Sequence, residues 1–383
     1  MIHKPDYKGG GITNLMSSVG ASFGWKSQYV PLKGFDAGQL SKSKNVVLLV
    51  IDGLGYEYLT TKGKNSFLNK HLTGRMTSVF PSTTASAITT FDTGLPPMQT
   101  AIVGWFTYLK ELGVVATILP FNPRYGGSPF YDVGVSREDI FDTPLFSDRI
   151  KASCYYVIPK EIVDGHPKKW GKKAFSFTTL NKFFVGIKKA VNTHNRRKFI
   201  YAYWPKYDGL SHEFGHQSQN ALAHFKEIDF GIKSFVEKIK DTNTTLIITS
   251  DHGFIDTTPS KTINLANHPK FLDTLVMPLS GDARVKYCYV RLSKEKEFKN
   301  YVNKYFKNYC YLFKSEELVK KNFFGLFEPH KRLHERIGDY TLIMKENYIL
   351  KDPILGRKSK QLIGNHSGVS SKEIFVPLVV MKL

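Results

Sequence analysis

Five short runs of aliphatic and aromatic residues recur along the chain, and each has the length of one strand. They occupy residues 46–51, 155–158, 199–203, 246–249 and 374–380, and read VVLLVI, YYVI, FIYAY, LIIT and IFVPLVV. Polar residues do not alternate with the apolar ones inside these runs. This pattern is typical of strands that are buried on both faces of a parallel sheet.

The segments between these runs show helical spacing. The clearest is residues 220–240, where apolar side chains make one stripe: Leu222, Phe225, Ile228, Ile232, Phe235, Val236 and Ile239. Strands that alternate with amphipathic helices predict an α/β fold with a doubly wound, mostly parallel sheet.

Two segments fall outside this alternation. Residues 1–44 are rich in Gly, Ser and Lys and show no clear period, so we expect an N-terminal arm lying over the body. A second segment contains a strand-like stretch at 284–292, a Lys-rich helical stretch at 294–306 and a strand at 340–344. The expected domains are therefore the arm (1–44), a catalytic core (45–280 and 361–383) and an inserted α+β subdomain or cap (281–360).

The composition fits a globular protein. Of 383 residues, 42% are hydrophobic and 23% are charged, which excludes the disordered and collagen-like classes. No apolar run approaches the roughly 18 residues of a membrane span. The first residues lack the apolar stretch of a cleavable signal, so we expect a cytoplasmic location, or export by a route without such a signal. The three widely spaced cysteines, Cys154, Cys288 and Cys310, argue against a disulfide framework and against a thiolate zinc site.

Charge is the strongest compositional bias. The chain has 54 Lys and Arg against 33 Asp and Glu, a net charge of +21. Such an excess attracts anions, so nucleic acid, an anionic membrane surface and small phosphorylated molecules are all compatible partners. The basic stretch 168–198 interleaves aromatic residues with cations, as phosphate-binding surfaces do. A solvated helix face over an apolar seam explains it as well, and we favour that interpretation.

Polar residues cluster where the predicted strands end. Asp52 directly follows the first run, and Asp251 follows the run at 246–249. Ligands of doubly wound sheets bind beyond the carboxyl ends of the strands, so these side chains are expected to converge. The full set of candidate ligands is Asp52, Asp208, His212, Asp251, His252 and His366. Oxygen and imidazole donors together suit Zn²⁺ or Mn²⁺.

Five short motifs around these residues occur in a fixed order. They are IDG at Asp52, FPSTT ending at Thr84, DGLSH from Asp208 to His212, SDHG at residues 250–253, and NHSG around His366. Their joint pattern resembles the alkaline phosphatase superfamily, in particular its nucleotide pyrophosphatase/phosphodiesterase branch and related bacterial type I phosphodiesterases. The resemblance extends from Asp52 to the end of the chain.

The resemblance implies a two-metal hydrolase of phosphodiesters or nucleotide pyrophosphates, acting through a covalent phosphothreonine intermediate on Thr84. It implies two divalent ions, with Zn²⁺ preferred and Mn²⁺ as the alternative. One ion would be held by Asp52, Asp251 and His252 and would bind Thr84; the other would be held by Asp208, His212 and His366. A Thr hydroxyl needs such activation to become a nucleophile. The implied substrate is small, anionic and phosphorylated, with a nucleotide as one option.

The residues after the nucleophile helix differ from many relatives. Thr100–Gly104 stands where many relatives have a His-Gly pair. Trp105, Phe106 and Tyr108 follow soon after and are candidates to contact the substrate, since aromatic rings stack on nucleobases. Ordinary core packing would explain them equally well.

Other functions remain open from the sequence. A phosphomonoesterase or phosphonate hydrolase could use the same metal core, and a monoesterase would need an extra cation such as Arg124 or Arg137. A non-catalytic basic protein that binds nucleic acid is less favoured.

Three histidine patterns have alternative explanations. His212-Glu213-x-x-His216 matches the zinc metalloprotease motif, although Gly215 weakens a helix there. His330 and His334 are spaced like a helical metal pair, and we favour a solvated helix face. His268 is expected to support the site from outside or to belong to the cap.

Overall fold

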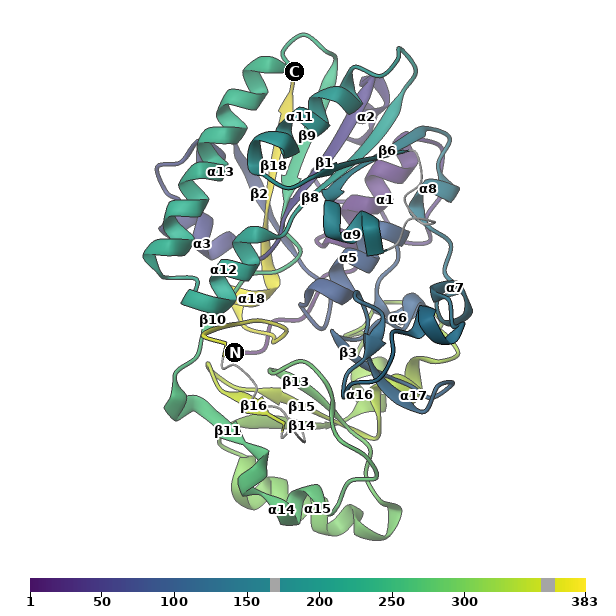
Figure 1. Cartoon of the computed structure of the whole chain (residues 1–383), viewed down its shortest axis with the longest axis vertical. Coiled ribbons are helices and arrows are strands. Elements are labelled where there is room, and N and C mark those ends of the chain that lie inside the picture. Colours follow the sequence, from purple (N-terminus) through teal and green to yellow (C-terminus); the bar gives the residue numbers. More distant parts are fainter. Residues whose placement is uncertain (166–172, 353–361) are drawn as a thin grey trace.

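A seven-stranded sheet forms the centre of the protein (Figure 1). The structure is a computed structural model and describes residues 1–165, 173–352 and 362–383. The strand order is β2-β18-β9-β1-β8-β6-β7. Neighbouring strands among β9, β1, β8, β6 and β7 run parallel, whereas β18 is antiparallel to both β9 and β2. The strands are β1 (Asn45–Ile51), β2 (Leu72–Thr77), β6 (Ser153–Pro159), β7 (Ala174–Phe177), β8 (Lys198–Trp204), β9 (Thr244–Thr249) and β18 (Phe375–Lys382). The predicted α/β fold with a mostly parallel sheet is confirmed.

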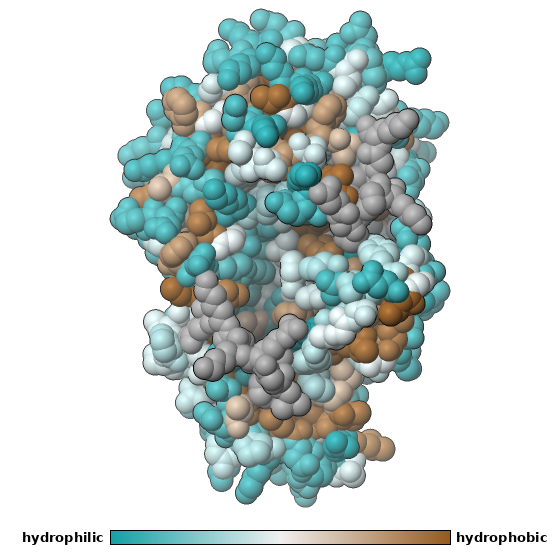
Figure 2. All heavy atoms as spheres, viewed as in Figure 1, coloured by the Kyte–Doolittle hydropathy of each residue, from teal (hydrophilic) through white to brown (hydrophobic). Residues whose placement is uncertain are grey.

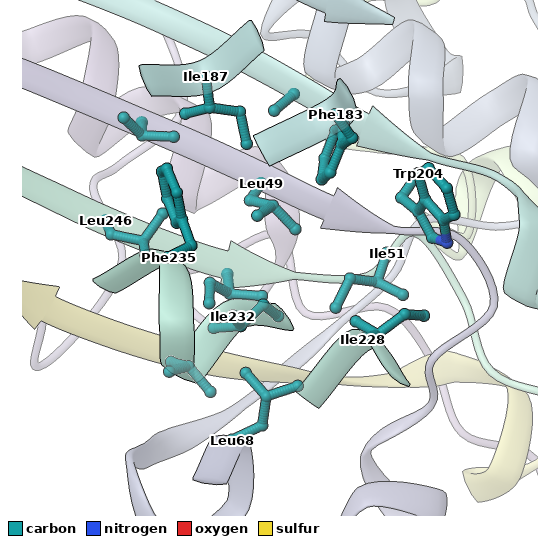
Figure 3. Close-up of a cluster of buried hydrophobic side chains, with 14 of the residues drawn as sticks. Leu49, Ile51, Leu68, Phe183, Ile187, Trp204, Ile228, Ile232, Phe235 and Leu246 are labelled. Carbon is teal, nitrogen blue, oxygen red and sulfur yellow. The ribbon is translucent and has the colours of Figure 1, made fainter. Parts of the chain in front are cut away.

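Helices cover both faces of this sheet. One face packs against α4 (Phe67–Lys70), α11 (Leu180–Val191) and α13 (Gln219–Lys238), and the other against α1 (Ile12–Ser22), α5 (Thr84–Thr93) and α8 (Phe146–Arg149). Alternate side chains of β1 point to opposite faces of the sheet. Leu49 therefore packs on the face that α4, α11 and α13 cover, and Leu48 on the face that α1, α5 and α8 cover. In Figure 3, Leu49 and Ile51 lie between side chains of α11 and α13.

The basic stretch overlaps α11. Phe183 and Ile187 are buried against the sheet, whereas Lys182, Lys188 and Lys189 are exposed. This arrangement agrees with a solvated helix face over an apolar seam. Residues 168–172 of the stretch lie outside the described residues.

The N-terminal 44 residues differ from the expected arm. They contain α2 (Ala37–Lys42) and the buried helix α1, in which Ile12, Leu15, Met16 and Val19 are all fully buried. Its Thr, Asn, Ser and Gly residues are buried too, and only Ala21 is exposed, so α1 presents no polar face to solvent. Ile12, Leu15, Met16 and Val19 follow the i, i+3, i+4, i+7 spacing of a helix, a short signal that the expectation of an arm without a clear period overlooked.

A second, four-stranded sheet lies in the expected insertion. Its order is β12-β13-β15-β14, with β12 at Ser280–Gly281, β13 at Val285–Cys288, β14 at Cys310–Lys314 and β15 at Tyr340–Met344. The strand predicted at 284–292 is shorter than expected, and the predicted helix is α15 (Glu295–Tyr301) followed by a π-helical turn. β14 was not predicted. Residues 353–360 lie outside the described residues, and the domain division stays a prediction.

The remaining elements are short. Three small sheets contain β3 (Phe106–Leu109), β4 (Val114–Thr117) and β5 (Asn122–Pro123); β10 (Ile255–Asp256) and β17 (Gly364–Asn365); and β11 (Thr262–Asn264) and β16 (Ile349–Lys351). The short helices are α3 (Tyr56–Thr61), α6 (Pro97–Thr100), α7 (Arg137–Ile140), α9 (Lys160–Gly165), α12 (Lys206–Phe214), α14 (Pro269–Leu272), α16 (Ser315–Lys320), α17 (Leu333–Ile337) and α18 (Ser371–Ile374). Among the described residues, no helix combines the length and hydropathy needed to cross a bilayer.

Asp256 at the end of β10 fixes the turn between α12 and α13. Its carboxylate lies 2.9 Å from Nδ1 of His216 and accepts hydrogen bonds from the backbone N–H groups of His216 (2.8 Å) and Gln217 (3.2 Å). Burial by itself would raise the pKa of Asp256, but the hydrogen bonds and the charge of His216 outweigh burial, and the pKa lies below its ordinary value.

This lowered pKa predicts an acid-sensitive contribution to stability. A carboxyl whose pKa is lower in the folded state stabilises the protein above its unfolded pKa, about 3.9, and this contribution disappears as the pH falls through the folded value. Asp256→Asn should therefore lower the free energy of unfolding at pH 7, and the difference from wild type should shrink towards about pH 3. Urea unfolding across this range, with a chelator present to exclude metal release, measures it. A difference that is constant with pH would contradict the assignment.

Candidate active site

The structure brings all seven predicted site residues together at the carboxyl edge of the sheet. Asp52 follows β1, and Asp251 and His252 follow β9. Asp208 and His212 lie one helical turn apart on α12, which begins directly after β8. His366 follows β17, and Thr84 is the first residue of α5. A hollow near the middle of the face in Figure 2 separates the part with the large sheet from the part with the four-stranded sheet.

Asp52, Asp251 and His252 form one group of donors. A carboxylate oxygen of each aspartate lies 3.4 Å from Nε2 of His252. The Thr84 hydroxyl lies 3.0 Å from the same nitrogen. One ligand atom from each of the three ligand residues falls within 4.8 Å of the others, a spacing that can hold a metal ion.

Asp208, His212 and His366 form a second group. Oδ1 of Asp208 lies 3.4 Å from Nε2 of His212 and 4.0 Å from Nε2 of His366, and the two imidazole nitrogens are 3.2 Å apart. The same Asp208 oxygen lies 4.0 Å from Nε2 of His252, so the two groups adjoin. Ligand atoms of His252, Asp208 and His366 also lie within 4.8 Å of one another, so these three residues could hold an ion as well. His252 therefore lies where the two groups meet.

Backbone carbonyl groups orient all three imidazoles. Nδ1 of His212 lies 2.8 Å from the Gly364 oxygen, Nδ1 of His252 lies 3.1 Å from the Gly253 oxygen, and Nδ1 of His366 lies 3.3 Å from the Ser82 oxygen. We assign the ring proton to Nδ1 in each case, since a carbonyl can only accept. Each Nε2 then directs a lone pair into the site, as metal-binding histidines do.

Three carboxylate oxygens in the site have no hydrogen-bond partner among the described residues. They are Oδ1 of Asp52, Oδ1 of Asp208 and Oδ2 of Asp251, and all three are buried. A buried carboxylate oxygen without a hydrogen-bond partner costs free energy. The lone pairs on Nε2 of His212 and Nε2 of His366, only 3.2 Å apart, repel each other and add to this cost. Divalent cations between these atoms would compensate both, so the donor set fits metal ions.

Burial and like charge perturb the titration of this cluster. Burial, followed by the charges of Asp208 and Asp251, raises the pKa of Asp52 well above its usual value. Burial also raises the pKa of Asp208. The pKa of His366 is lowered by burial and by its neighbours His252 and His212. Protons therefore compete with cations for the two carboxylates, and binding of a metal ion should release protons from the site.

Tyr203 supports the first group and was not predicted. Its hydroxyl, buried at the end of β8, donates a hydrogen bond to Oδ2 of Asp52. The backbone N–H groups of Gly53 and His252 donate to Oδ1 of Asp251, each at 3.0 Å. These contacts leave the opposite oxygen of each aspartate directed at the site. Tyr203 was visible in the sequence only as part of a strand.

Two cavities adjoin Thr84. The first, of about 520 Å³, is lined mainly by aliphatic and aromatic side chains and reaches Asp52 and Asp208. The second, of about 370 Å³, is lined by His212, His366 and Asp282 among others. Trp105 lines both cavities and Phe106 lines the second.

Of the other candidates, Tyr108 and Arg124 do not line these cavities, whereas Arg137 does. Tyr108 packs edge to face against Tyr289, with ring centroids 5.1 Å apart. Arg124 pairs with the buried Asp352 at 2.9 Å. Arg137 lines the first cavity and donates a hydrogen bond to the Ile118 carbonyl at 2.8 Å.

The competing histidine patterns do not assemble into metal pairs. Helix α12 ends at Phe214, Gly215 has a φ of +88°, and His216 turns to Asp256 instead of joining His212. His330 lies before α17 and pairs with Asp142 at 2.8 Å, so it does not share a helix with His334. His268 contacts the Tyr301 hydroxyl at 2.9 Å, within the apolar cluster of the insertion.

Solved structures with the same fold include two classes of hydrolase. Human ectonucleotide pyrophosphatase/phosphodiesterase 5 superposes with a TM-score of 0.67 at 16% identity, covering 88% of this chain and 87% of that one. The murine protein gives 0.66 at 16% identity, with 87% of each chain covered, and an inactive variant of it was solved with AMP. Phosphonoacetate hydrolase from Sinorhizobium meliloti, in complex with phosphonoformate, gives 0.63 at 15% identity, covering 88% and 90%.

Comparison at the sequence level gives the family. No curated protein matches the chain closely enough to be compared residue by residue. The family model for type I phosphodiesterase/nucleotide pyrophosphatase matches residues 46–368, which include every motif described above. The chain therefore belongs to the type I phosphodiesterase/nucleotide pyrophosphatase family of metal-dependent hydrolases, within the alkaline phosphatase superfamily.

Proposed function

We propose that this enzyme hydrolyses phosphodiesters or nucleotide pyrophosphates, with Thr84 as the nucleophile and two divalent ions in the site. The position of Thr84 carries the proposal: its hydroxyl lies 3.0 Å from Nε2 of His252, beside three buried carboxylate oxygens that have no hydrogen-bond partner. The solved complex of a structural neighbour with AMP supports a nucleotide as substrate.

The two groups of donors divide the ions. Asp52, Asp251 and His252 would hold one ion, and Asp208, His212 and His366 the other. Zn²⁺ and Mn²⁺ both accept mixed carboxylate and imidazole ligands. We take Zn²⁺ as the preferred ion and Mn²⁺ as the alternative. When bound, such ions lower the pKa of hydroxyl groups and neutralise charge on phosphoryl oxygens.

The start of α5 supports Thr84 as the residue that attacks the phosphoryl group. It begins α5, so the N–H groups of the first helical turn and the positive end of the helix dipole face the substrate. The Thr84 hydroxyl gives up its proton to water, its oxygen forms a bond to phosphorus as the bond to the leaving oxygen breaks, and the leaving alkoxide takes a proton from water. Water then attacks the phosphothreonine and restores the Thr84 hydroxyl.

The cavities favour a diester over a monoester. Among the described residues that line them, Arg137 is the one Lys or Arg side chain, and it already binds the Ile118 carbonyl. A monoester dianion would have Arg137 as its one further cation among these residues, whereas the second ester group of a diester can occupy the apolar first cavity. A phosphonate hydrolase is the second candidate, supported by the neighbour solved with phosphonoformate.

The net charge of +21 acts at longer range. It would draw small phosphorylated anions towards the site, and capture should weaken as salt rises. Binding to nucleic acid is compatible with this charge but is not required by the site.

Replacing the nucleophile tests the mechanism. Thr84→Ala should reduce kcat/KM for bis(4-nitrophenyl) phosphate by at least about a thousandfold, because the attacking oxygen is lost. Thr84→Ser should retain a substantial fraction of the activity. Thr89→Ala is the matched control on the same helix, since the Thr89 hydroxyl bonds the Ala85 carbonyl and should leave the rate unchanged. An active Thr84→Ala enzyme would refute the assignment.

A pair of substrates with the same leaving group tests the specificity. Metal-loaded enzyme should cleave bis(4-nitrophenyl) phosphate with a kcat/KM at least about tenfold above that for 4-nitrophenyl phosphate, a difference of about 1.4 kcal/mol. The reverse order would indicate a monoesterase. Release of phosphate from phosphonoacetate, with neither ester cleaved, would favour the phosphonate hydrolase instead.

A further inference from the structure

A buried ion pair joins the four-stranded sheet to the loops that carry the metal-binding histidines. Arg284 lies between β12 and β13, and Glu373 lies in α18. Their side chains are 1% and 0% exposed. Nε and Nη2 of Arg284 donate to the two carboxylate oxygens of Glu373, at 2.6 and 3.0 Å, in the two-bond geometry of the strongest such pairs.

Glu373 also holds two loops of the site. The N–H of Gly368, two residues after His366, donates to its Oε1 at 2.8 Å. The N–H of Gly253, the residue after His252, donates to its backbone carbonyl at 2.8 Å. The Ser370 hydroxyl donates to its Oε2 at 2.5 Å. One residue outside every motif therefore fixes the backbone beside two ligands, one from each donor group.

These contacts leave no free space. A methyl group on Gly253 would stand 2.0 Å from the Lys372 carbonyl oxygen, and one on Gly368 would stand 2.7 Å from both Glu373 oxygens. Ser367, between His366 and Gly368, has a φ of 92°, a conformation that persists only when the surroundings impose it. The bond from Gly368 to Glu373 supplies part of that constraint.

Arg284 is itself fixed on the side of the insertion. Its Nη1 donates to the Tyr348 carbonyl at 2.6 Å, and its Nη2 donates to the Glu346 carbonyl at 2.8 Å. A buried ion pair adds little net stability compared with apolar residues of similar volume, because desolvation offsets the attraction. The geometry of the pair between Arg284 and Glu373 is well defined. Its main effect is therefore to fix the position of the loops that Glu373 contacts.

We propose that Arg284 and Glu373 are positioning residues of the metal centre, which hold the imidazoles of His252 and His366 at the separation that two ions require. The two rings stack with centroids 3.7 Å apart and an interplanar angle of 18°. This inference rests on the proposed function, in which these histidines bind different ions. Through Arg284, the insertion would then help to determine the geometry of the metal site.

Binding of Co²⁺ alone tests the inference without an activity assay. Glu373→Gln keeps the size of the side chain and loses its charge, so the dissociation constant for Co²⁺ should rise about 10- to 100-fold, as it does for other partners of metal ligands. The visible absorption of bound Co²⁺ should change, because the ligand geometry changes. Arg284→Lys keeps the charge without the paired bonds and should show a smaller effect.

A matched ion pair in the same part of the chain serves as the control. Arg336 is 1% exposed and binds Glu111 at 2.9 Å, and it also donates to the Ala101 carbonyl. Glu111→Gln should lower the melting temperature and leave Co²⁺ affinity and absorption unchanged. This comparison separates a general loss of stability from a loss of position.

A mild variant covers the case in which Glu373→Gln does not fold. Ser370→Ala removes one hydrogen bond to Glu373 and should raise the Co²⁺ dissociation constant about three- to fivefold. If folded Glu373→Gln, or Ser370→Ala in its place, binds Co²⁺ with wild-type affinity and absorption, the inference is wrong and the proposed function stands. If the wild-type protein fails to bind Co²⁺, the proposed two-metal function itself fails.

Discussion

Repulsion among like groups in one small volume is the constraint on which the rest of the site depends. Three aspartates and three imidazoles direct lone pairs into the same space, and three buried carboxylate oxygens there have no hydrogen-bond partner in the described part of the chain. Divalent cations relieve this repulsion, and they also supply the activation that a Thr hydroxyl lacks. In the proposed function, the stability of the site and its chemistry therefore depend on the same ions.

The fold meets this constraint by its topology. Neighbouring parallel strands end at one edge, so Asp52, Asp208 and Asp251 come from segments far apart in sequence and still converge. Backbone carbonyl groups then select the tautomer of each histidine, and Tyr203 turns one oxygen of Asp52 away from the site. The insertion adds a contact from outside the sheet, through Arg284 and Glu373.

The sequence predicted the features with a local signal. Strands β1, β6, β8, β9 and β18 are uninterrupted apolar runs, and the candidate ligands lie in short motifs at their ends. Helix α1 carries only one short run of helical spacing among Ser, Thr and Gly residues, and edge strand β2 has only two large apolar residues, Leu72 and Met76. Tyr203, Arg284 and Glu373 act through contacts between distant segments, which no local pattern indicates.

The stereochemistry of hydrolysis at phosphorus tests the central claim most directly. A phosphodiester made chiral at phosphorus by sulfur substitution would be cleaved in heavy-oxygen water, and the configuration of the product determined. Attack by Thr84 followed by attack of water inverts the phosphorus twice, so the account predicts net retention of configuration. Net inversion would mean that water attacks the substrate directly, and would contradict the role of Thr84.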